Sequence, residues 1–347
     1  MQQVIGIADW DTTKVTNLFR MFQSAGTTAP GLTTLDLHTH GTSWDVSNVT
    51  TMSYMFNNAN KLVSLDTTGW KIGTNKTNVT LDNMFGNAVS LTTITGSETW
   101  DTSKVINMSN MFDSTTALPT VVGIKNWDVA NVTTMASMFY ASGITTLDIS
   151  GWNAAKVTTM VTMFYQAASL TVLDAVGLAP GSGTATSATN LQQMFDGTTV
   201  LRSVTGIEDW DVSKVANISY MFRNSGRTAP GLTTLDLHKW NVANVTTTQN
   251  MFNGANRMTT LNLSDWNLGK VTTMVNMFAN ATALTTVDAT GWNPGALTAT
   301  AGTTMTTMFQ NTTALTNVIG ITNWNVSKVT SMSNMFADSM KTTSTTR

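Results

Sequence analysis

Carboxylate side chains recur at one position of a short apolar and polar alternation, where they could ligate a cation or contact a basic partner. The members of this set are Asp36, Asp66, Asp148, Asp174, Asp236 and Asp288. A calcium site needs six to eight oxygen ligands, several of them carboxylates. Each recurrence supplies only one carboxylate, so we predict a solvated face and no bound metal.

A second acidic set lies beside tryptophan, and Asn occupies its positions as readily as Asp. Its members are Asp11, Asp45, Asp101, Asp128, Asp211, Asn153, Asn241, Asn267, Asn293 and Asn325. Asp and Asn share the ability to bond the backbone two residues further along the chain. We therefore predict that this set shapes turns and that its charge has no purpose of its own.

Hydroxyl side chains form a third set, two residues before the first acidic set. This file contains Thr34, Thr93, Thr120, Thr146, Thr234, Thr260 and Thr286, with Ser64 and Ser203. A regular file of threonines raises ice binding as a minor alternative function. The neighbouring file is Asp, however, so the Thr-x-Thr lattice that would favour ice is missing.

Catalysis needs a unique pair of positioned acid, base or nucleophilic groups. The polar groups of this chain are periodic or scattered in loops, so we predict no enzyme, no catalytic residue and no cofactor. His38 and His40 could lie on one strand face as partial metal ligands. A surface loop is the favoured interpretation for them and for His238.

These side chains must be positioned by a repeat, because a Met-Phe pair occurs twelve times, about every 28 residues. Each pair ends a segment such as residues 49–56, whose apolar residues at i, i+3, i+6 and i+7 predict a two-turn helix. Between these segments, alternation as in residues 232–237 predicts a strand with Thr234 and Asp236 facing outward. A tryptophan turn usually follows the strand.

Units this short cannot bury their apolar edges alone, so they must stack. We predict an α/β fold, a right-handed leucine-rich-repeat-like solenoid of about twelve strand-turn-helix repeats with a parallel sheet on one face. Residues 1–347 form one array, which could belong to a longer one. The Trp and Met-Phe stripes belong to its core rather than to a sugar or cofactor platform, and longer loops fall at 71–78, 179–190 and 293–304.

Composition narrows the classes of partner. Charged residues are 11% of the chain, against about 25% in typical soluble domains. A net charge of −2 gives no basic stripe for nucleic acid or anionic lipid. The chain has no cysteine, no run of apolar residues long enough to insert into a membrane, and no visible export signal.

The strings LTTLDLHKWNVANVT and WDVSKV, followed by segments ending in MF, resemble the BspA-type leucine-rich-repeat surface proteins and the surface-lipoprotein repeats of mycoplasmas. The resemblance covers essentially the whole chain. It implies extracellular or cell-surface display and adhesion to host or neighbouring-cell macromolecules. Display on a virion surface is a further option.

We therefore expect a non-catalytic binding module that recognises a protein or glycan through its sheet face and edge loops. The residues expected to make contact are Thr34, Asp36, Thr146, Asp148, Thr234, Asp236, Thr260, Thr286 and Asp288. The alternative is structural, because no distinct cap is visible at either end of the array. Uncapped units could then stack end to end into a rod, a filament or a virion fibre.

Overall fold

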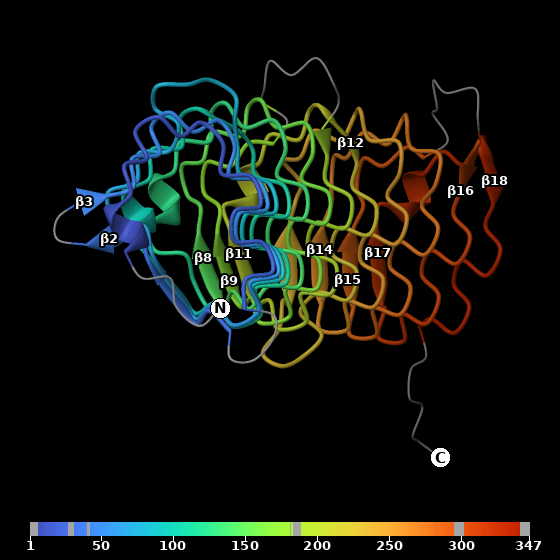
Figure 1. Cartoon of the computed structure of the whole chain (residues 1–347). Coiled ribbons are helices and arrows are strands. Elements are labelled where there is room, and N and C mark those ends of the chain that lie inside the picture. Colours follow the sequence, from blue (N-terminus) through green and yellow to red (C-terminus); the bar gives the residue numbers. More distant parts are fainter. Residues whose placement is uncertain are drawn as a thin grey trace.

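The computed structural model describes residues 6–26, 31–39, 42–180, 182, 189–294 and 302–340 of the chain. The chain winds into a parallel β-solenoid whose coils stack from the blue N-terminal coil to the red C-terminal coil (Figure 1). Within these residues the helical elements are short 3-10 turns and none is an α-helix. None of the helices found there is long and apolar enough to cross a bilayer.

One surface of the solenoid, which we call the strand face, is built from ten three-residue strands. They are β1 (Thr34–Asp36), β4 (Ser64–Asp66), β6 (Thr93–Thr95), β8 (Thr146–Asp148), β9 (Val172–Asp174), β11 (Ser203–Thr205), β13 (Thr234–Asp236), β14 (Thr260–Asn262), β15 (Thr286–Asp288) and β17 (Asn317–Ile319). They pair in parallel as β1-β4-β6, β8-β9-β11 and β13-β14-β15-β17. The middle residue of each strand is buried and its neighbours face outward, which confirms the predicted strand period. Twelve strand-turn-helix repeats are not confirmed.

The predicted helices are wrong. In residues 49–56 the amide of Met55 bonds the carbonyl oxygen of Met52 at 3.1 Å, which closes a tight turn. The amides of Met52 and Phe56 instead bond carbonyl oxygens of the next coil, at 3.0 and 2.8 Å. Tyr54 lies between them with a left-handed φ of 59°. A row of three-residue turns thus produces the same apolar spacing as a helix, while half of its amides connect coils.

A second parallel ladder runs through these turns and supports the stacking. Its strands are β5 (Val79–Thr80), β7 (Val105–Asn107), β10 (Thr189–Asn190), β12 (Val215–Asn217), β16 (Thr303–Thr304) and β18 (Val329–Ser331), paired as β5-β7, β10-β12 and β16-β18. Single-residue bridges such as Thr134 to Thr159 continue it between these pairs. Neighbouring coils are therefore hydrogen bonded along this second ladder, and coils within one sheet are also bonded along the strand face.

The remaining elements shape the turn before tryptophan and one hairpin. The 3-10 turns are η1 (Ile7–Asp9), η2 (Ser97–Thr99), η3 (Ile124–Asn126), η4 (Ile207–Asp209) and η5 (Ile321–Asn323). Each follows a glycine with a left-handed φ and precedes a tryptophan. Strands β2 (His38–Thr39) and β3 (Thr42–Ser43) form an antiparallel pair. Of the predicted long loops, residues 181, 183–188 and 295–301 lie outside the described residues.

Aromatic columns fill the core, as predicted for the Trp and Met-Phe stripes. The phenylalanine rings stack continuously from Phe22 to Phe336, with centroids 4.9 to 5.7 Å apart in successive coils. Buried indoles also bond across coils, because Nε1 of Trp152 donates to the carbonyl oxygen of Ile124 at 3.0 Å. The exceptions lie in the first and last coils, where Trp10 and Phe336 are exposed.

Candidate binding surface

The structure brings the predicted contact residues together in two files on the strand face. Thr234, Thr260 and Thr286 occupy matching positions of three neighbouring strands. Asp36 lies opposite Asp66, and Asp148 opposite Asp174, in the same way. The nine predicted residues are all exposed or half-buried; they are Thr34, Asp36, Thr146, Asp148, Thr234, Asp236, Thr260, Thr286 and Asp288. Parallel strands lie about 4.8 Å apart, so each file repeats at that spacing within a sheet.

Most of these strands begin at the second residue of a Thr-Thr pair, and the hydroxyls of the two threonines make different contacts. The hydroxyl of Thr259 donates to the carbonyl oxygen of Thr233 in the preceding coil at 3.1 Å, and Thr285 does the same to Thr259 at 2.9 Å. The hydroxyls of the next threonines, Thr260 and Thr286, have no hydrogen-bond partner within the described residues, whereas the hydroxyl of Thr93 lies 3.4 Å from that of Thr92. The recurring Thr-Thr pair in the sequence indicated these two roles, but the sequence analysis considered only the second threonine of each pair.

The carboxylates of the strand face are turn residues as well as surface groups. Oδ1 of Asp148 accepts from the hydroxyl and the amide of Ser150, at 2.6 and 3.0 Å. These bonds lower the pKa of Asp148. Burial raises the pKa of Asp236, but its bonds from the imidazole and amide of His238 outweigh burial and lower that pKa overall. One oxygen of each of these two carboxylates therefore stabilises a turn.

The second acidic set forms turns beside tryptophan, which confirms its prediction. Oδ1 of Asp45 accepts from the amide of Ser47 at 2.8 Å, and Oδ1 of Asn241 accepts from the amide of Ala243 at 3.2 Å. An amide oxygen replaces a carboxylate oxygen there without loss of the bond. These residues serve the fold and add nothing specific to a binding surface.

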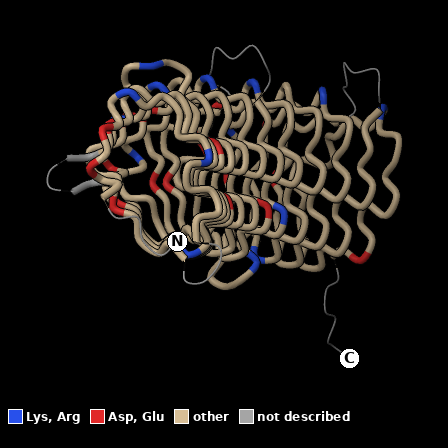
Figure 2. The backbone as a smooth tube through the Cα atoms, in the orientation of Figure 1, with Lys and Arg blue, Asp and Glu red and all other residues tan. Residues whose placement is uncertain are grey.

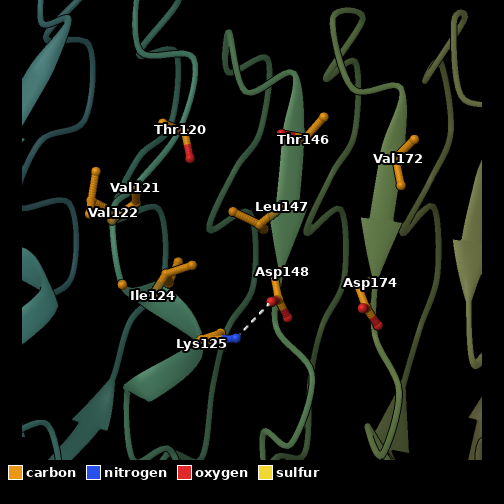
Figure 3. A pocket seen from close by; sticks show the side chains of 11 residues that line it. Thr120, Val121, Val122, Ile124, Lys125, Thr146, Leu147, Asp148, Val172 and Asp174 are labelled. Carbon is orange, nitrogen blue, oxygen red and sulfur yellow. Dashed lines mark ion pairs between the residues drawn. The ribbon is translucent and has the colours of Figure 1, made fainter.

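Two shallow grooves interrupt the strand face where its sheets break. One, of about 500 Å³, lies between residues 120–125 and β8, and the Lys125 ammonium lies 3.5 Å from Asp148 at its rim (Figure 3). The other, also about 500 Å³, lies between β11 and β13 and is lined by Arg202, Glu208 and Lys239 among others. The two grooves have similar size, and both carry charged side chains, since Lys125, Asp148 and Asp174 line the first.

Charge is sparse over the rest of the solenoid. Most of the backbone carries neither acid nor base, and charged residues are scattered over the coils (Figure 2). No group of three His, Asp or Glu side chains within the described ranges could hold a metal ion. His238 contacts Asp236, His40 lies outside the described residues, and the side chain of His38 is likewise not described.

One ionic pair was missed by sequence reasoning. Asp196 and Arg223 each follow the phenylalanine of a Met-Phe pair, one coil apart, and their side chains join at 2.7 Å. The guanidinium of Arg223 also lies over the ring of Tyr220, 4.8 Å from its centroid. Both residues lie at the same distance along the chain from a Met-Phe pair, and this shared position in successive coils could have predicted that they meet.

Comparison with known proteins shows which family this repeat matches. The family described as "Mycoplasma protein of unknown function, DUF285" matches residues 2–96, 79–174, 184–292 and 228–346. A leucine-rich repeat protein from Eubacterium ventriosum, known from a crystal structure, is 15% identical, with a TM-score of 0.37 over 90% of this chain and 84% of that one. None of the curated proteins compared with the chain matches it.

Proposed function

This chain belongs to the mycoplasma-type repeat family DUF285, and we propose that it is a non-catalytic binding module that recognises a protein or glycan through its strand face. The observation that carries the proposal is the file of threonine hydroxyls on the strand face. Those of Thr34, Thr146, Thr234, Thr260 and Thr286 have no hydrogen-bond partner among the described residues, whereas that of Thr93 lies 3.4 Å from the hydroxyl of Thr92. Because neighbouring threonines bond the preceding coil, these hydroxyls remain available to a ligand.

Many small contacts suit a surface of this kind. The hydroxyls repeat at the strand spacing within each sheet, on a scaffold held by two hydrogen-bonded ladders and stacked aromatic columns. Each coil contributes little, and affinity grows with the number of coils that a partner engages. The file contains Val172 and Asn317 and is broken between sheets, which favours a macromolecular partner over the continuous flat lattice of ice.

The place of action that we propose is the cell surface or the extracellular space. Support comes from the resemblance of the repeat to displayed surface proteins. The partners would then be proteins or glycans of a host or of neighbouring cells. The edge loops beside the strand face would extend the contact area.

The test is binding to glycan arrays and immobilised extracellular proteins, with a matched pair of variants. The first variant carries Thr146→Arg and Thr234→Arg, which leaves the turn-forming carboxylates of Asp148 and Asp236 in place. The control carries Lys156→Trp and Lys270→Trp, at exposed positions outside the strand face. We expect the first variant to lose binding at least tenfold while the control retains it. Equal binding by all three chains would refute the strand face as the contact surface.

End-to-end association is a second candidate. Trp10 and Phe19 are exposed in the first described coil, and Met332 and Phe336 in the last. A second copy of the chain stacked on these edges would bury this apolar surface. Light scattering across concentration tests it: growing particles that Phe336→Lys abolishes support association, and an unchanging monomer opposes it.

A further inference from the structure

Outside the strand face, one residue per coil forms a row directly after the phenylalanine of each Met-Phe pair, and we call it the Met-Phe row. In six successive coils its members are Gly86, Asp113, Tyr140, Tyr165, Asp196 and Arg223. The backbone holds them in register. The amide of Ser114 bonds the carbonyl oxygen of Tyr140, and the amide of Ala141 bonds that of Tyr165, both at 2.7 Å. Neighbouring side chains of the row therefore lie side by side.

Two tyrosines occupy the middle of the row. The rings of Tyr140 and Tyr165 stack with their centroids 5.1 Å apart and their planes at 21°, and both residues are half-buried. Tyr165 covers one face of the Tyr140 ring, so the other face is directed toward the coil of Asp113. Burial raises the pKa of Tyr140, and the nearby charges of Tyr165 and Asp113 add to that rise. The free face of Tyr140 and the Asp113 carboxylate are thus neighbours.

An acid lies at each end of the tyrosine pair, and the two acids differ in their partners. Asp196 is joined at 2.7 Å by Arg223, the next member of the row. Asp113 has Gly86 at the corresponding place on its own outer side. Within the described residues no lysine or arginine pairs with Asp113. The row is therefore symmetric about the tyrosines, except that one arginine is missing.

The carboxylate of Asp113 is half-buried and accepts one side-chain bond, from the hydroxyl of Ser114 at 2.7 Å. Burial raises the pKa of Asp113, and this bond opposes the rise. Gly86 has no side chain to cover the carboxylate. The Asn57 amide beyond it donates to the carbonyl oxygen of Gly86 at 3.0 Å. A buried charge is costly unless it is paired, so a cation at this place would stabilise Asp113.

The chain itself shows which cation suits such a place. The guanidinium of Arg223 lies 4.8 Å from the centroid of the Tyr220 ring while it pairs with Asp196. The guanidinium of Arg20 lies 5.3 Å from that of Tyr54. A guanidinium is planar, stacks on aromatic faces and can bond a carboxylate through two N–H groups, whereas an ammonium is a compact point charge. Two of the four tyrosines already carry an arginine, and the other two form the pair.

We propose that Asp113 and the free face of Tyr140 bind an arginine side chain of a partner protein. The guest guanidinium pairs with Asp113 as Arg223 pairs with Asp196, and it stacks on the Tyr140 ring. A glycan is disfavoured, because each tyrosine covers one ring face of the other and a neutral sugar leaves the carboxylate unpaired. The inference goes beyond the proposed function, since this site lies outside the strand face and adds a protein contact to it.

The experiment is an NMR titration of the whole chain with ¹³C-labelled tyrosine rings, whose signals are assigned with single Tyr-to-Phe variants. The probe is the capped peptide Gly-Gly-Arg-Gly-Gly, and its control carries citrulline, which has a similar shape without the charge. We expect the arginine peptide to shift the signals of Tyr140 and Tyr165. The signals of Tyr54 and Tyr220 should stay in place, because an arginine already lies over each ring. The citrulline peptide should shift none of the four.

Two variants with the same change in net charge separate this site from the charge of the whole chain. Asp113→Asn removes the carboxylate and should weaken peptide binding at least fivefold, measured on the Tyr140 signal. Asp128→Asn changes an exposed turn residue outside the row and should leave the affinity unchanged. Unaltered signals of Tyr54 and Tyr220 in each variant show that its fold is intact.

Three results would overturn the proposal: equal shifts with the citrulline peptide, shifts at all four tyrosines, or unchanged affinity in the Asp113→Asn chain. Chitotriose is titrated in parallel, and shifts of Tyr140 with this sugar alone would show a glycan site and overturn the arginine proposal as well. The titration uses no array ligand, so the arginine site and the strand-face proposal can fail separately.

Discussion

Nη2 of Arg223 lies 2.7 Å from Oδ2 of Asp196, one coil earlier, and Nε of the same guanidinium bonds both carboxylate oxygens at 3.0 and 2.9 Å. The Asp196 side chain is only 2% exposed. Burial raises the pKa of Asp196, and the bonds from Arg223 oppose that rise. The pair joins two coils, and its bonds reduce but do not cancel the cost of burying the carboxylate.

Replacing Arg223 by alanine should destabilise the chain by about 2 kcal/mol at pH 7, because a buried carboxylate loses its partner. Without the guanidinium the pKa of Asp196 in the folded state rises further, so protonation relieves the variant before the parent and the loss should shrink as the pH falls through that pKa. Urea unfolding of R223A and the parent at pH 7 and pH 4 measures this difference. An equal loss at both pH values would show that the carboxylate is not the cause.

The left-handed turn residues separate the observed turns from the predicted helices. Asn110 has a φ of 55°. In a helix, Asn110→Ala would stabilise the chain, whereas in a left-handed position it should destabilise it by about 1 kcal/mol, with Asn110→Gly close to neutral. Denaturant midpoints of the two variants give the sign directly. A gain in stability for the alanine variant would favour the helix.

Replacing a strand-face Asp by Asn should preserve the stability of the chain better than replacing it by Ala. Oδ1 of Asp148 accepts two bonds from Ser150, and Asn keeps that acceptor. Asp148→Ala should cost about 1 kcal/mol and Asp148→Asn clearly less. Because the folded pKa of Asp148 is lowered, its contribution is present above the unfolded pKa and is lost as the pH falls through the folded value. Thermal unfolding between pH 3 and 7 tests both statements, and Asp148→Asn should flatten this part of the profile.

Core and end tryptophans should respond differently to truncation. Trp152 is buried and bonds the preceding coil, whereas Trp10 is 55% exposed. Trp152→Ala should cost about 3–5 kcal/mol through the cavity and the lost bond, and Trp10→Ala about 1 kcal/mol or less. Guanidinium unfolding of the two variants compares them. Similar losses would place Trp152 outside the core.

The sequence predicted the solenoid because period and burial coincide. Strand residues such as Thr234 and Asp236 alternate with buried ones, and the Met-Phe and Trp columns repeat once per coil. The pattern could not exclude the helices, because apolar residues three positions apart are expected both for a helix and for a row of three-residue turns. Frequent Asn just before Met-Phe, as in Asn110, and two residues after it, as in Asn58, was a local hint of left-handed backbone.

Most residues of the candidate binding surface could also be predicted from the sequence, but the grooves that interrupt it could not. Both files follow from alternation alone. The grooves depend on which amides lack a partner in the next coil, and that requires register between residues far apart in sequence. Pro119 has no amide hydrogen for the preceding coil, and it marks a break in the ladder only once its position there is known. The pairing of Asp196 with Arg223 likewise needs the coil length.

The central claim is that the strand face makes the contact with a partner, and the absence of cysteine from the chain permits a direct test. Thr234→Cys and Lys270→Cys each place one thiol on an exposed site, the first on the strand face and the second outside it. Each is coupled to maleimide-polyethylene glycol, and binding to the array ligands of the parent chain is measured. Loss of binding after coupling at position 234 and retention at position 270 is the predicted result. Binding that survives at 234, or is lost only at 270, would contradict the claim.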